Sequence, residues 1–153
     1  MKKLLLLLAA FTLLFISCEK EDENASLENT WKLTSASEDG ESYTLDECEL
    51  QSIIVFSGSN FTSTYYYAEE IYNTETYQYE TTGECITYSN SGTYTTSGNT
   101  ITLTSDGETN SDFFSISGNT LTVSGSGSDT YYDDDLQEEV TETWTWSYTY
   151  TKQ

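Results

Sequence analysis

Residues 143–151 read Thr-Trp-Thr-Trp-Ser-Tyr-Thr-Tyr-Thr, a strict alternation of hydroxyl and aromatic side chains. Successive side chains of a β-strand point to opposite faces of the sheet. A period of two therefore places the four aromatic rings on one face and the hydroxyl groups on the other. The segment predicts a half-buried antiparallel strand whose aromatic face is turned towards a core.

Two earlier segments, 93–104 and 113–124, repeat one hairpin design twenty residues apart. Each turns at a Gly-Asn pair, Gly98-Asn99 or Gly118-Asn119, and these residue types tolerate the positive φ of tight hairpin turns. Two apolar residues alternate with Thr on each return strand. We interpret the repeat as two successive hairpins of one β-meander.

The rest of the chain after residue 26 is also typical of short strands, because runs of Thr, Tyr, Ile and Val are separated by Gly and Asn. Further strands are predicted at residues 30–35, 53–57, 61–68, 77–81 and 86–88. A helical turn is considered only at residues 44–50. We therefore expect an all-β protein of about eight or nine strands. A small antiparallel up-and-down β-barrel is the expected architecture, with a flattened sandwich as the alternative.

Residues 1–17 are predicted to be a lipoprotein signal peptide. Two lysines precede an uncharged run at 4–16, which suits a secretory signal and is short of the about 20 residues of a membrane span. Cys18 follows Ser17 as in a bacterial lipobox, where the cysteine is acylated and becomes the first mature residue. The alternative is an ordinary secretory signal. Residues 18–26 are predicted to be an acidic disordered tether, so residues 27–153 form the folded domain.

The three cysteines fit this scheme. If Cys18 carries lipid, Cys48 and Cys85 remain as one even pair. Exported proteins reach compartments where disulfides form and persist. We therefore predict a Cys48–Cys85 disulfide, with two free buried thiols as the alternative.

The composition excludes several classes of function. The chain has no His and no Arg, and five Lys stand against 26 acidic residues, for a formal net charge of −21. Without an imidazole there is no Ser-His-Asp or Cys-His nucleophile system. So acidic a chain repels the phosphate backbone that nucleic-acid-binding proteins neutralise with basic residues. We expect no nucleic-acid partner.

Carboxylate clusters give no specific sign of catalysis or of metal binding. The Asp run at 133–135 lacks the Asp-x-Asp-x-Asp-Gly spacing of a calcium loop. The Glu pairs at 69–70 and 138–139 consist of strand neighbours that face opposite ways, whereas glycosidases need two facing carboxyl groups. We expect no catalytic residues, no metal and no cofactor.

The segment 27–33, Leu-Glu-Asn-Thr-Trp-Lys-Leu, resembles the Leu-x-Gly-x-Trp-x-Leu opening of lipocalin-like domains in Bacteroidetes outer-membrane lipoproteins. The resemblance continues over residues 27–153, through both later cysteines, an Ile-x-Phe strand at 54–56, Gly92-x-Tyr94 and the Gly-Asn hairpins. It implies a small up-and-down barrel. The Arg that covers the Trp in true lipocalins is missing, so only the broad architecture is implied. The acidic stretch after Cys18 resembles the signal that sends some of these lipoproteins to the cell surface.

We therefore expect a non-catalytic binding or accessory lipoprotein, lipid-anchored in the outer membrane at the cell surface or at its periplasmic face. A small hydrophobic or glycan ligand would enter the open end of the barrel. The alternative is a barrel filled by its own side chains, with an outer face for an envelope protein partner. Aromatic residues are the candidates for ligand contact, and core packing is their alternative role. They are Trp31, Tyr65, Tyr67, Tyr94, Trp144, Trp146 and Tyr148.

The lipid anchor makes the first testable prediction. In Cys18→Ala the acylated thiol is lost, and we expect the exported protein to leave the membrane fraction, because the acyl chains supply the membrane affinity. Fractionation followed by a carbonate wash measures this. A Cys18→Ala protein that stays with the washed membranes would refute anchoring through Cys18.

Overall fold

The computed structural model describes residues 26–133 and 137–153. Within them nine strands form one antiparallel sheet, joined by tight turns and a single 3-10 turn. The elements are β1 (Asn29–Glu38), β2 (Glu41–Tyr43), η1 (Glu49–Gln51), β3 (Ile53–Ser57), β4 (Asn60–Asn73), β5 (Gln78–Ser97), β6 (Thr100–Ser105), β7 (Glu108–Ser117), β8 (Thr120–Asp133) and β9 (Glu138–Lys152).

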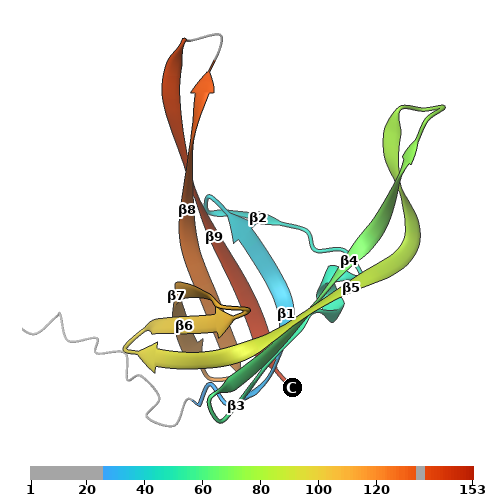
Figure 1. Ribbon diagram of the computed structural model, residues 1–153. Coiled ribbons are helices and arrows are strands. Elements are labelled where there is room, and N and C mark those ends of the chain that lie inside the picture. Colours follow the sequence, from blue (N-terminus) through green and yellow to red (C-terminus); the bar gives the residue numbers. More distant parts are fainter. Residues whose placement is uncertain (1–25, 134–136) are drawn as a thin grey trace, which may run out of the picture.

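The sheet closes on itself. Its order is β2-β1-β3-β4-β5-β6-β7-β8-β9, and β1 also pairs with β9. Eight strands thus make a closed up-and-down barrel, and β2 is an additional strand on β1 (Figure 1). The predicted all-β barrel and its strand number are confirmed, and the flattened sandwich is not formed.

Local predictions hold with two differences. Both Gly-Asn turns are present, and Gly98 and Gly118 have φ of 56° and 58°. The separate strands expected at 77–81 and 86–88 belong to one long strand, β5, which carries an irregularity opposite Ala68–Glu70. The helical turn is shorter than expected and is fixed by reciprocal backbone-to-side-chain hydrogen bonds between Asp46 and Glu49.

One half of the barrel interior is a packed apolar core. It lies towards the end of the barrel where the hairpins turn at Gly58, Gly98 and Gly118. Trp31 is only 1% exposed, and its Nε1 donates a hydrogen bond of 2.8 Å to the Leu27 carbonyl. Burying each large side chain contributes about 1.5–3 kcal/mol. The buried hydrophobic cluster comprises Leu27, Trp31, Leu33, Ala36, Leu45, Ile54, Phe56, Phe61, Ile101, Leu121 and Tyr150.

Three glycines make room for neighbouring groups. A Cβ on Gly92 would lie 2.0 Å from the Thr104 carbonyl oxygen. Gly125 faces Trp146 and Gly127 faces Trp144 across the β8–β9 ladder. A Cβ would lie 2.5 Å from the indole ring at Gly125 and 2.4 Å from it at Gly127. The two tryptophans therefore lie flat over glycines of the next strand.

Two hairpins extend beyond the barrel wall. β3 pairs with β4 only as far as Thr64, and β6 pairs with β5 only from Thr93, so residues 65–92 form the β4–β5 arm. The ladder between β7 and β8 ends at Ser124, and beyond this residue β8 pairs with β9 alone. Residues 125–133 and 138–145 therefore form the β8–β9 arm. Both arms rise from the same end of the barrel and splay apart (Figure 1).

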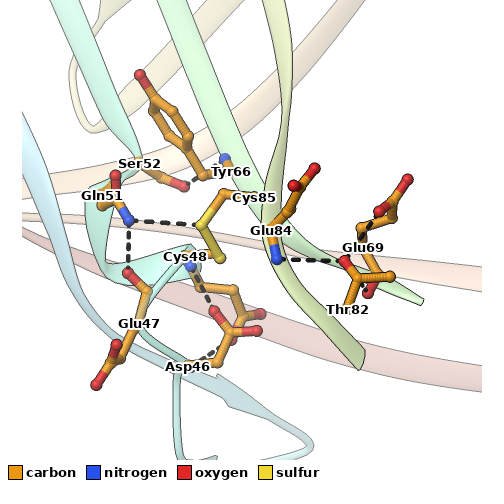
Figure 2. Close-up of a disulfide and its surroundings, with 11 residues drawn as sticks. Asp46, Glu47, Cys48, Gln51, Ser52, Tyr66, Glu69, Thr82, Glu84 and Cys85 are labelled. Atoms are coloured by element: carbon orange, nitrogen blue, oxygen red, sulfur yellow. Dashed lines mark hydrogen bonds between the residues drawn. A yellow bond between two sulfur atoms is a disulfide. The ribbon is translucent and has the colours of Figure 1, made fainter. Parts of the chain in front are cut away.

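The predicted Cys48–Cys85 disulfide is confirmed, with a Cα–Cα distance of 5.5 Å. It joins the segment around η1 to the base of the β4–β5 arm (Figure 2). Beside it, Gln51 Nε2 contacts Cys85 Sγ at 3.6 Å, and the Tyr66 amide donates a hydrogen bond of 3.0 Å to Ser52 Oγ. A cross-link over 37 residues stabilises the fold by about 4 kcal/mol in the chain-entropy model.

The predicted signal peptide at 1–17, Cys18 and nearly all of the predicted tether lie outside the described residues. Among the residues that the structure describes, no helix is long and apolar enough to cross a membrane.

The close approach at Gly92 generates a prediction. In Gly92→Ala the new methyl group overlaps the Thr104 carbonyl, so one strand must shift, at a cost of about 3 kcal/mol. A thermal melt should show a midpoint lower by roughly 10 °C. The control is Ser91→Ala, an exposed neighbour, which we expect to melt close to the parent. Equal midpoints for the two variants would contradict this account of Gly92.

Candidate functional site

The half of the barrel on the side of the two arms contains a cavity of about 520 Å³ that opens to solvent. Strands β3 to β9 all contribute to its wall. It is lined by Ile54, Phe61, Ser63, Tyr65, Tyr88, Asn90, Leu103, Ser105, Asp106, Glu108, Asn110, Asp112, Ser126 and Trp146. We call this cavity the barrel mouth.

The strand register positions these side chains. Residues directly opposite each other in an antiparallel ladder share one face, and every second residue of a strand returns to it. Tyr65 pairs with Tyr88 across β4 and β5, and Leu103 pairs with Asn110 across β6 and β7. Along β6 and β7 the inward positions change from apolar to polar towards the barrel mouth, which therefore has an apolar floor and polar groups in its walls.

Besides Phe61, three aromatic rings line the barrel mouth. Tyr65 and Tyr88 come from the β4–β5 hairpin, and Trp146 comes from β9. Trp146 lies over Gly125 and tilts against Tyr148, with ring centroids 5.4 Å apart. Its position is fixed by these two contacts, so its indole is a preformed flat surface at the cavity wall.

Amide and hydroxyl groups stand between the rings. The single hydroxyl hydrogen of Ser105 is shared between two acceptors, Asn90 Oδ1 and the Ser91 carbonyl oxygen, and this contact holds the Asn90 side chain at the wall. Asn110 adds a second amide and Ser63 a buried hydroxyl. The barrel mouth therefore offers several hydrogen-bond donors and acceptors within one concave surface.

The charges at the barrel mouth are all negative. Asp106, Glu108 and Asp112 line it, and neither lysine of the described part of the chain does. Burial raises the pKa of the Asp112 carboxyl above its ordinary value. Burial likewise raises the pKa of the Tyr65 hydroxyl. Removal of water disfavours the charged form of Asp112, and no described lysine lines the cavity to stabilise that charge. A cationic or hydrogen-bond-donating group of a ligand would therefore stabilise the Asp112 carboxylate.

A second cavity of about 290 Å³ adjoins the first, and Tyr65 lines both. Burial and then Tyr148, to which Tyr43 is hydrogen-bonded, raise the pKa of Tyr43 to about 12. Burial also raises the pKa of Tyr150. The phenols of Tyr43 and Tyr150 therefore stay neutral at physiological pH. The lining residues are Leu33, Tyr43, Leu45, Glu49, Ser52, Tyr65, Tyr66, Tyr67, Tyr148 and Tyr150.

The structure separates the aromatic candidates named from the sequence into three groups. Tyr65 and Trp146 line the barrel mouth, and Tyr65 also lines the second cavity together with Tyr67 and Tyr148. Trp144 lies over Gly127 on the β8–β9 arm.

The remaining two candidates, Trp31 and Tyr94, lie elsewhere. Trp31 is buried in the core, the alternative that the sequence left open. Tyr94 packs against that core and meets Phe56 edge to face at 4.9 Å.

Sequence reasoning missed the polar residues of the barrel mouth. Asn90, Asn110 and Asp112 were not named, and neither was Tyr88. A signal for two of them was present, because the inward positions of 110–116 read Asn-x-Asp-x-Phe-x-Ile and change from polar to apolar along one strand. A strand whose inward side chains change from polar to apolar marks the boundary between an open cavity and a filled core.

Comparison with known protein families gives a match. A family model described as Lipocalin-like domain matches residues 27–123, which extend from just before β1 into β8. The matched range contains most of the residues that line both cavities. No curated protein and no solved structure matches the chain.

The raised pKa of Asp112 generates a prediction. Above the folded-state pKa the carboxylate is charged in both states and only the folded state bears the cost of burial. Asp112→Asn should therefore raise the melting midpoint at pH 7. The gain should shrink as the pH falls through the raised folded pKa towards the ordinary Asp value of about 3.9, because the folded parent then takes up a proton first.

Melting curves of the parent and of Asp112→Asn at pH 7 and pH 4.5 check this. The control is Glu139→Gln, which removes one exposed carboxylate from β9 and reports general relief of charge repulsion. A gain no larger than that of the control, or one independent of pH, would contradict the assignment to buried Asp112.

Proposed function

The chain belongs to the family of lipocalin-like domains, and on this premise we propose that it is a binding module that holds a glycan fragment in its barrel mouth. The observation that carries the proposal is the open cavity of about 520 Å³ in which aromatic rings, side-chain amides and a half-buried carboxylate converge. A cavity of this size suits a small ligand of one or a few sugar rings.

The polarity of the barrel mouth favours a glycan over a hydrophobic ligand. A purely apolar ligand would cover the amides of Asn90 and Asn110 and the carboxylate of Asp112 without bonding to them, and each covered group would cost about 1–3 kcal/mol. A sugar ring instead presents hydroxyl groups to such side chains. Its C–H face stacks on an aromatic ring, such as the indole of Trp146.

The charges narrow the class of glycan. Asp106, Glu108 and Asp112 repel a uronic acid or a sulfated sugar, because like charges brought together in a cavity disfavour binding. The proposed ligand is therefore neutral or carries an amine.

A structural or interaction protein with a self-filled barrel is the second candidate. The observation that favours it is the packed half of the interior, where Trp31, Phe56 and Leu121 leave almost no exposed surface. The side chains of that half account for stability but do not fill the barrel mouth, so the binding role is the stronger proposal.

We further propose that the domain is non-catalytic and lipid-anchored in the outer membrane through Cys18, at the cell surface or the periplasmic face. Lipocalin-like domains are generally binding modules. The disulfide supports an extracytoplasmic location, because such bonds are rare in the cytosol. The proposed order along the chain is a signal peptide at 1–17, a tether at 18–26 and the barrel domain at 27–153.

Calorimetric titration with neutral oligosaccharides tests the binding role. Cello-, malto- and chito-oligosaccharides of two to four units serve as probes, and trigalacturonic acid serves as the acidic counterpart. We expect at least one neutral probe to bind and the acidic probe not to bind. Tyr88→Ala and Trp146→Ala should each weaken that binding about tenfold or more, because each removes a stacking surface.

The matched control is Tyr132→Ala, which removes an exposed ring from β8 that lines neither described cavity. It should bind like the parent, and melting curves confirm that each variant is folded. If a medium-chain fatty acid binds and no oligosaccharide does, the hydrophobic ligand replaces the glycan. If none of these probes binds, the self-filled alternative gains support.

A further inference from the structure

The β4–β5 arm carries exposed apolar surface that extends beyond the residues lining the two cavities. Thirteen large hydrophobic side chains of the described residues are exposed, and eight of them lie on this arm. Tyr77 and Tyr79 are 77% and 70% exposed. A concentration of exposed apolar side chains on one element often marks an interaction site. The eight are Tyr65, Tyr67, Ile71, Tyr72, Tyr77, Tyr79, Ile86 and Tyr88.

The arm also has free strand edges. Between residues 67 and 89 no described strand pairs with β4 on its β3 side or with β5 on its β6 side. Nearer the barrel, the Tyr66 amide is bonded to Ser52 Oγ and the Ser91 carbonyl accepts from Ser105. An isolated two-stranded ribbon is only marginally stable in water, and unpaired edges readily accept another strand. The exposed side chains of Ile71, Tyr72, Tyr77, Tyr79 and Ile86 neither belong to the core nor line either described cavity, so the barrel fold does not account for them.

The arm is nonetheless held in place at its base. Cys85 pairs with Ala68 in the ladder and is disulfide-bonded to Cys48. The irregular backbone next to it is stabilised by Thr82 Oγ1, which donates to Glu69 Oε2 at 2.9 Å and accepts from the Glu84 amide (Figure 2). Because its base is fixed, the arm loses little conformational entropy when it binds.

The chemistry of the arm selects its partner. Its ionisable side chains apart from tyrosine and cysteine are all acidic, namely Glu69, Glu70, Glu75, Glu80 and Glu84. Tyr72 and Tyr79 form a ring pair across the ladder with centroids 5.3 Å apart. Lys and Arg side chains suit such a surface, because their aliphatic stems cover the rings while their charged ends reach the carboxylates and the ring faces.

We infer that the β4–β5 arm is a docking site for a basic polypeptide segment, which adds to a free edge of the ribbon and covers the Tyr72–Tyr79 pair. A second copy of this chain is disfavoured, because each copy has a formal charge of −21 and the arms would repel each other. Strand addition supplies backbone hydrogen bonds, and the exposed tyrosines and glutamates supply the selectivity for a basic segment.

The inference does not depend on the glycan site, and a peptide titration tests it on the mature domain. The probe is a ten-residue peptide of alternating Lys and Val, and its Glu-Val counterpart is the negative probe. We expect the basic peptide alone to bind. In the double variant Tyr72→Ser/Tyr79→Ser its affinity should fall at least tenfold, although no charge is changed.

The control variant is Phe113→Ser, which removes a ring that is 66% exposed on β7, away from the arm. It should bind the basic peptide like the parent. Mass spectrometry of the unreduced proteins verifies that the disulfide at the arm base has formed in every variant. Equal affinity of the double variant and the parent would show general attraction to an acidic protein and would overturn the inference. Dimerisation that is lost in the double variant would instead assign the arm to a second copy.

Discussion

The pairing of the first and last strands of the barrel is the contact on which the other features depend. β1 lies against β9 in a register that sets Leu33 beside Tyr150 and Ala36 beside Tyr148. A bulge after Leu33 is accommodated by Thr34, whose hydroxyl donates a hydrogen bond of 3.0 Å to the Thr149 carbonyl. Without this ladder the sheet would have two open edges and no interior, so neither the core nor the cavities would exist.

Closure creates one interior, and the sequence divides it into two halves with different roles. Where the inward positions are Trp, Ile, Leu and Phe, the side chains fill the space and supply the stability of the domain. Where they are Asn, Ser and Asp, they leave a water-accessible cavity. A small barrel is just wide enough to be filled by its own side chains, so the substitution of shorter polar residues is sufficient to open one end.

Period-two patterns predicted the strands, the two Gly-Asn hairpins and the barrel, because alternation and turn chemistry are local properties of the chain. The disulfide was also predicted, from the number of cysteines. The candidate site was predicted only in part: Tyr65 and Trp146 line the barrel mouth, while Trp31 lies in the core and Tyr94 packs against it. Alternation shows that a ring faces inward but does not show how far along the barrel axis it lies. That depth depends on register and shear, which are set by contacts between distant strands.

Tyr65 has a consequence for the volume available to a ligand. Its ring is a shared wall between the barrel mouth of about 520 Å³ and the tyrosine-lined cavity of about 290 Å³. Side chains move between staggered rotamers without any change in the backbone. A rotation about the Cα–Cβ bond of Tyr65 would therefore change the shape of both cavities at once. The space available to a ligand in one cavity is thus linked to the space in the other through a single side chain.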